Sequence, residues 1–224
     1  MKEINLSNLP KSIAEEVMED NSEVRKNFIN HFSSQIDDFI MAMSSAYHNW
    51  KEFDTNIGTD MEKAHISALI YSAINSHIIS MKIFLSGYIV PAGNLQRQVL
   101  ETIALALLCS NPRLKVLDRF MKNNYSTHKA VEDVLNNYQK LNLNKTAVQV
   151  MKRSQKFYHK YSHPSLLSLA SLISFSKKGK LYLGASFDDG KINEYTKEIN
   201  GRVSLANLFD NIIDGIKANI EKWK

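Results

Sequence analysis

The most restrictive feature of the sequence is one apolar stripe along residues 22–53. Its members recur every three or four residues without interruption, which is the spacing of one face of an α-helix. They are Val24, Phe28, Phe32, Ile36, Phe39, Met43, Tyr47 and Trp50. A half-buried strand would instead alternate with a period of two. This stretch therefore predicts one long amphipathic helix.

Caps and prolines mark the limits of further helices. Thr59 is followed three residues later by Glu62, a capping-box pattern that predicts the start of a second helix running to about residue 90. Pro91 is expected to end that helix, with a turn after it and a third helix over 94–110. Shorter helices are predicted over 113–123, 126–139, 146–162 and 164–174.

The sequence changes character after residue 174. Residues 175–186 include the run SKKGKLYLG, which predicts a turn at Lys178-Gly179 between two short strands. A last helical stretch follows, capped by Asp188 or Asp189. The sequence thus predicts an all-α fold, a bundle of long antiparallel helices with one small β-hairpin. The single predicted domain consists of an N-terminal arm (1–20), a helical core (22–174), the hairpin (175–190) and a C-terminal helix (191–224).

Cysteine usage and apolar runs bear on the compartment. Of 224 residues 44% are apolar, and the one cysteine, Cys109, lies in an apolar run, as expected of a buried, reduced thiol. The start of the chain lacks the apolar core of a signal peptide. Residues 64–81 carry no charge, but Ser72, Ser76 and Ser80 form a polar stripe that favours a buried helix over a membrane span. We expect a cytoplasmic protein with no membrane partner.

Charge is distributed unevenly. The net charge is +5, yet residues 134–187 contain no Asp or Glu and nine Lys or Arg. Such a block attracts polyanions, above all nucleic acid, and its aromatic residues could stack on unpaired bases. The candidate contacts are Lys152, Lys156, Lys160, Lys177 and Lys178. In the competing interpretation, the lysines only solvate one helix face while Phe157 and Tyr161 pack inward.

Arg97 and Glu101 form the first polar constellation, four residues apart in an otherwise apolar helix. They could be an internal ion pair that fixes helix register, or part of a site.

The second constellation is RSQKFYHKYSHPS, residues 153–165. His159 and His163 have the spacing of zinc ligands, but no adjacent glutamate accompanies them and Pro164 is expected to break the helix, so no metal site is predicted. The sequence has no phosphate-binding loop and no serine-nucleophile elbow, and no cofactor is expected.

The spacing of Arg153 and His159 resembles the Arg-x(4–6)-His signature of the HEPN superfamily. These are all-helical proteins, many of which are metal-independent ribonucleases in toxin–antitoxin, abortive-infection and CRISPR-linked defence. QRQVLET and the later YSHPS together look like an uncharacterised bacterial branch of that superfamily, over about residues 66–175. The chain departs from the signature at Ser154, where the family favours Asn, Asp or His. Arg25 and His31 repeat the spacing, but outside the acid-free block.

The resemblance implies cleavage of RNA by its own 2′-hydroxyl. His159 or His163 would transfer the proton and Arg153 would hold the phosphate, while Lys152, Lys156 and Lys160 would supply backbone contacts. It also implies a homodimer with a composite site.

The alternative function is a non-catalytic helical module that dimerises, its basic block docking a polyanion or an acidic partner. Arg97, Glu101 and His163 would then be buried structural groups. Whether the chain is an enzyme is left open by its sequence.

Overall fold

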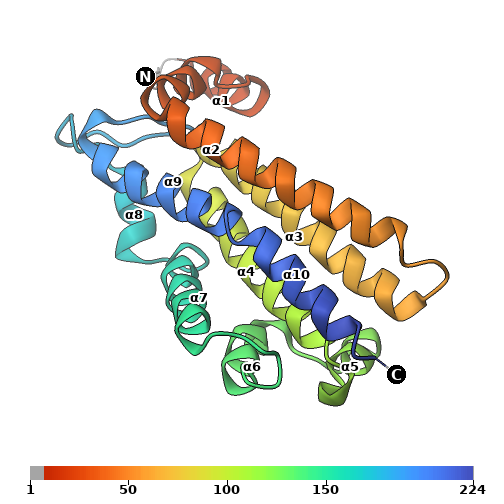
Figure 1. Ribbon diagram of the computed structural model, residues 1–224. Helices are drawn as coiled ribbons and strands as arrows, with labels where there is room; N and C mark the ends of the chain where they lie inside the picture. Colours follow the sequence, from red (N-terminus) through yellow and green to blue (C-terminus); the bar gives the residue numbers. More distant parts are fainter. Residues whose placement is uncertain (1–7, 224) are drawn as a thin grey trace.

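A computed structural model describes residues 8–223 of the chain (Figure 1). The described part is all-α, as predicted. Its α-helices are α1 (Leu9–Met18), α2 (Ser22–Thr55), α3 (Met61–Leu85), α4 (Ile89–Cys109), α5 (Val116–Met121), α6 (Ala130–Asn136), α7 (Lys145–Tyr158), α8 (Leu166–Leu172), α9 (Ile192–Ala206) and α10 (Phe209–Ile220). Short 3-10 turns are η2 (Pro112–Leu114), η3 (Thr127–Lys129), η4 (His159–Tyr161) and η5 (Asp189–Lys191).

The bundle consists of α2, α3 and α4 with α9 and α10 lying along them (Figure 1). Most of the predicted apolar stripe of α2 is buried, and Phe28 lies at one aromatic centre of the core. Its ring centroid is 5.1 Å from that of Phe84, and 4.9 Å from those of Phe187 and Tyr195. Burying each such ring contributes about 1.5–3 kcal/mol. Residues from three distant parts of the chain thereby hold α2, α3 and α9 together.

The junction of α3 and α4 differs from the prediction. Asp60, not Thr59, caps α3, because its carboxylate accepts the backbone N–H groups of Glu62 and Lys63. The helix ends at Leu85, so Pro91 does not end it but lies in the first turn of α4. A proline is tolerated there because the N–H groups of a first helical turn have no partner within the helix.

The β-hairpin predicted near 175–186 is not present. In this described segment a single antiparallel bridge joins Ile173 and Leu181. The N–H groups of Phe175 and Ser176 instead donate to the Asp188 carboxylate, at 2.6 and 3.1 Å. A side chain thus takes the hydrogen bonds that a second strand would have needed, and the prediction was wrong for that reason.

The two ends of the chain and the longest apolar run add detail to the predicted elements. The N-terminal arm contains α1, and the predicted C-terminal helix is two helices, α9 and α10, with a break after Ala206.

Of the described helices, α3 is long and apolar enough to cross a membrane, and 44% of its most apolar window is buried in the bundle. Core helices pass the same test of length and composition.

Candidate functional site

Two histidines of the predicted site lie together where α7 ends. Asn144 starts this helix by accepting the N–H groups of Thr146 and Ala147, and η4 continues the chain after Tyr158. His159 and His163 are both exposed, and their ring centroids are 4.5 Å apart in an edge-to-face arrangement. Two imidazoles in contact at the surface can exchange protons with a bound ligand.

Arg97 and Glu101 of α4 lie beside these histidines. Arg97 Nε donates to Glu101 Oε1 at 2.9 Å, and their side chains are 20% and 16% exposed. Gln155 of α7 donates to the same carboxylate oxygen at 3.0 Å. Among the described hydrogen bonds, the Arg97 guanidinium uses only its Nε, in the bond to Glu101. Its two terminal nitrogens can therefore bind an anion. We call Arg97, Glu101, Gln155, His159 and His163 the histidine–arginine cluster.

The cluster alters the pKa of His159. Partial desolvation lowers it below the ordinary 6.5, and the positive charges of Arg97 and His163 lower it further, while Glu101 acts in the opposite direction. His159 is therefore neutral at pH 7, the form that can accept a proton.

Arg153 is exposed on α7. The charged groups that act on His159 are those of Arg97, His163 and Glu101, so the guanidinium with the strongest effect on this histidine comes from α4. The Arg-x5-His spacing alone gave no sign of this neighbour. Only the packing of α4 against α7 and η4 places Arg97 there.

The basic block is not free of acids in space. Lys152 pairs with Glu132 of α6, and Glu101 of α4 lies against α7. The other candidate lysines are exposed: Lys156, Lys160, Lys177 and Lys178. Four of the five predicted lysines therefore remain at the surface without an acidic partner among the described ion pairs.

The aromatic residues of this region divide between surface and core. Tyr158 and Tyr161 are buried and pack with Leu100 of α4, whereas Phe157 is exposed. Of these three rings, only Phe157 is available to stack on a base.

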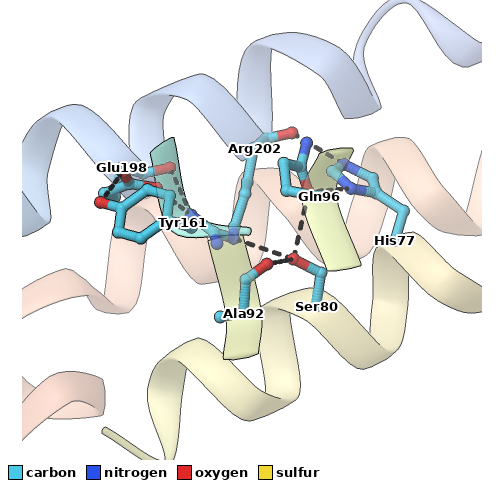
Figure 2. A network of polar contacts seen from close by, with 7 residues as sticks. All are labelled: His77, Ser80, Ala92, Gln96, Tyr161, Glu198 and Arg202. Carbon is cyan, nitrogen blue, oxygen red and sulfur yellow. Dashed lines mark hydrogen bonds and ion pairs between the residues drawn. The ribbon is translucent and has the colours of Figure 1, made fainter. Parts of the chain in front are cut away.

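A second polar network lies inside the bundle (Figure 2), and sequence reasoning missed it. Arg202 of α9 is 0% exposed, and its guanidinium pairs with Glu198 at 2.7 Å. Glu198 also accepts the hydroxyl of Tyr161 at 2.8 Å, while Arg202 Nε donates to Ser80 of α3 at 3.3 Å. The only sequence signal is the i, i+4 spacing of Glu198 and Arg202, which surface pairs share.

This buried network fixes the position of η4. Tyr161 is anchored by Glu198, and its ring lies directly over Gly93 of α4, where any Cβ would overlap it. His159 begins the same short turn and His163 follows it by two residues. The interior therefore determines where the two exposed imidazoles stand.

The described residues contain no group of three or more His, Cys, Asp or Glu placed to hold a metal. Cys109 is buried, and desolvation raises the pKa of its thiol to about 12, so it is not a ready nucleophile. Comparisons with models of protein families, with curated proteins and with solved structures gave no match. The assignment of function therefore depends on the chemistry of the cluster.

Proposed function

We propose that this protein is a HEPN-like, metal-independent ribonuclease whose active site is the histidine–arginine cluster. The observation that carries the proposal is the contact between two exposed imidazoles beside a guanidinium with unused terminal nitrogens. The acid-free block supplies exposed Lys156 and Lys160 next to the same site. The active form would be a cytoplasmic homodimer, as the resemblance implies.

In the proposed mechanism, neutral His159 removes the proton of an RNA 2′-hydroxyl. The 2′-oxygen attacks the adjacent phosphorus and the bond to the 5′-oxygen breaks, leaving a 2′,3′-cyclic phosphate. His163, as imidazolium, gives the departing 5′-oxygen its proton. Arg97 binds the non-bridging oxygens through its terminal nitrogens and stabilises their charge in the transition state. Glu101 and Gln155 position Arg97.

The test is cleavage of 5′-labelled RNA in EDTA by the wild type and by His159→Ala. Loss of the general base should lower the rate about 10²- to 10⁴-fold. The matched control is His48→Ala, because His48 is an exposed histidine of α2 outside the cluster. We expect a 2′,3′-cyclic phosphate end and a bell-shaped pH profile, because one histidine must be neutral and the other protonated. The acidic limb of that profile should lie below 6.5, since the pKa of His159 is lowered. Intact RNA, or equal rates for the two variants, contradicts the proposal.

One specific observation favours the second function, a non-catalytic module that docks an acidic partner. Leu166 of α8 is 87% exposed and Leu181 is 71% exposed, and Phe175 is also exposed between them in sequence. Lys177 and Lys178 are exposed in the same segment. Exposed apolar and basic side chains in one segment of the chain fit a partner with both acidic and apolar side chains.

This second function is tested by removing the apolar groups and keeping the charge. If docking is the main function, the double variant Leu166→Ser, Leu181→Ser no longer co-purifies with a partner that the wild type captures from cells. Neither the wild type nor the variant then cleaves RNA. If both leucines can be replaced while cleavage persists, the docking function is not the main one.

A further inference from the structure

A pocket of about 420 Å³ opens between α4, α7, α9 and α10. Its floor consists of buried side chains of α4, namely Leu100, Ile103 and Leu107. Met151 of α7 and Leu205 of α9 line the walls. This volume lies within the range of sites that hold small molecules.

The lining of the pocket contains no Asp, Glu, Lys, Arg or His. Asn144, Ser204 and Asn211 are polar and exposed, so they belong to the mouth. Ser154 is half-buried and Tyr158 is buried, and each adds a hydroxyl group to the lining. A charged group inside would lose its hydration with no opposite charge to replace it. The pocket therefore fits an uncharged and mostly apolar molecule.

Gln96 is the most deeply buried polar residue of the lining, at 1% exposure. The structure turns the amide oxygen of Gln96, Oε1, inward, where it lies 3.0 Å from His77 Nδ1 and 3.1 Å from Ser80 Oγ (Figure 2). His77 Nε2 lies 3.0 Å from the carbonyl oxygen of Arg202, which can only accept, so Nε2 carries a proton. Burial lowers the pKa of His77 to about 4, so the ring is neutral at pH 7. Because its one N–H is on Nε2, Nδ1 carries no proton and must accept a hydrogen bond.

A neutral His77 requires a donor at the inward end of the Gln96 amide. A half-turn of the amide puts its nitrogen there, and the two hydrogens then serve His77 Nδ1 and Ser80 Oγ. Ser80 keeps its own hydrogen for the carbonyl oxygen of Ala92, at 3.0 Å. The amide oxygen of Gln96 is then at the other end, which has no partner among the described hydrogen bonds.

We propose that this pocket binds an uncharged, mostly apolar small molecule that donates one hydrogen bond to the Gln96 amide oxygen. A phenol or an alcohol with an alkyl chain has this chemistry. The pocket lining shares no residue with the histidine–arginine cluster, and the proposal does not rest on the proposed nuclease activity.

The first test measures binding of the uncharged fluorophore N-phenyl-1-naphthylamine to the full chain. We expect enhanced, blue-shifted emission that saturates with the wild type. Ser204→Phe, at the exposed mouth, should weaken binding at least about tenfold. Asn193→Phe places the same ring on an exposed position of α9, about three helical turns before Ser204 and outside the pocket lining, and should leave binding unchanged. No saturable emission, or equal loss in the two variants, overturns the proposal.

The second test uses ligands rather than variants, because replacing buried Gln96 would disturb His77 and Ser80. Competition with the fluorophore compares 4-pentylphenol, its methyl ether and 4-pentylbenzoate. One hydrogen bond should make the phenol bind about three- to tenfold tighter than the ether, and the anion should bind weakest. Equal binding of phenol and ether overturns the role of Gln96. Tightest binding of the benzoate overturns the preference for an uncharged ligand.

Discussion

Arg202 is the side chain whose burial most needs compensation. Its guanidinium is held by Glu198 and Ser80, and it lies 4.6 Å from the ring centroid of Phe84. One terminal nitrogen, Nη2, is buried with no hydrogen-bond partner. A buried cation in this position depends on its one carboxylate partner.

Glu198→Gln should therefore be strongly destabilising. The substitution leaves Arg202 charged, buried and unpaired, and we expect a loss of about 3–5 kcal/mol in the free energy of unfolding. Urea denaturation measures it, with Glu194→Gln as the exposed control on the same helix, where a change within about 0.5 kcal/mol is expected. Similar small changes in both variants would show that the Arg202–Glu198 pair contributes little to the free energy of unfolding.

His77 should make the stability depend on pH. Its pKa is about 4 in the folded protein and 6.5 when unfolded, so the unfolded chain binds the proton first. The contribution of His77 to the free energy of unfolding should be constant well above pH 6.5 and should fall as the pH drops from 6.5 towards 4. The contribution of His77 to this fall is about 3 kcal/mol.

Urea denaturation of the wild type and of His77→Gln at pH 7 and pH 5 isolates this effect. The variant lacks the titrating ring and should lose less stability between the two pH values. An equal loss in both proteins would mean that other groups carry the dependence.

At the residue scale, part of the candidate site could be predicted. Arg97 and Glu101 were recognisable because two charges interrupt an apolar helix. Glu198 and Arg202 have the same spacing but lie among polar neighbours, so the sequence gives no sign of their burial. Burial of those two depends on how α9 packs on α3, which no local pattern contains.

At the element scale, one glycine controls how closely η4 approaches α4. A Cβ on Gly93 would overlap the ring of Tyr161, whereas a Cβ on Gly215 of α10 would meet open space. Both glycines lie within helices, so alanine has the better intrinsic propensity at each.

Gly93→Ala should destabilise the protein by about 1–3 kcal/mol through overpacking, and it should displace η4 with its histidines. Gly215→Ala should raise the stability by about 0.5–1 kcal/mol. Thermal unfolding of the two variants checks the opposite signs. A stabilising effect of alanine at both positions would show that the contact with Tyr161 is easily relieved.

The elements themselves follow from the sequence to different degrees. The long α2 was predictable because its apolar period extends over eight positions. The hairpin prediction was wrong, because the backbone N–H groups of Phe175 and Ser176 donate to the Asp188 carboxylate instead of to a second strand. That side chain is twelve or thirteen residues away in sequence. Pro91 was misplaced for a similar reason, since a proline fits the start of a helix as well as a stop.

At the scale of the whole molecule, the histidine–arginine cluster joins α4 to the end of α7. Gln155 and Glu101 are 54 residues apart in sequence, yet their side chains are 3.0 Å apart. A spacing motif within one helix cannot encode such a neighbour. Arg153 was predictable as a candidate, whereas the position of Arg97 beside His159 follows only from the tertiary arrangement.

RNA affinity should depend on salt if the exposed lysines bind phosphates. With His159→Ala, which would bind without cleaving, the logarithm of the affinity for single-stranded RNA should fall linearly with the logarithm of salt concentration. Lys156→Gln should reduce that slope by about 0.7, while Lys26→Gln on exposed α2 should not. Fluorescence anisotropy measures both slopes. If the affinity of His159→Ala for RNA does not change with salt concentration, the phosphate-binding surface is contradicted.

The most direct test of the cluster as an active site compares two arginine variants in one RNA cleavage assay in EDTA. Arg97→Gln should lower the cleavage rate by about 10²-fold or more, because it removes the guanidinium beside His159. Arg153→Gln should lower it only a few-fold, as the loss of one exposed charge does. A larger loss at Arg153 would place the site on the Arg-x5-His spacing instead, and no cleavage by the folded wild type would contradict the nuclease itself.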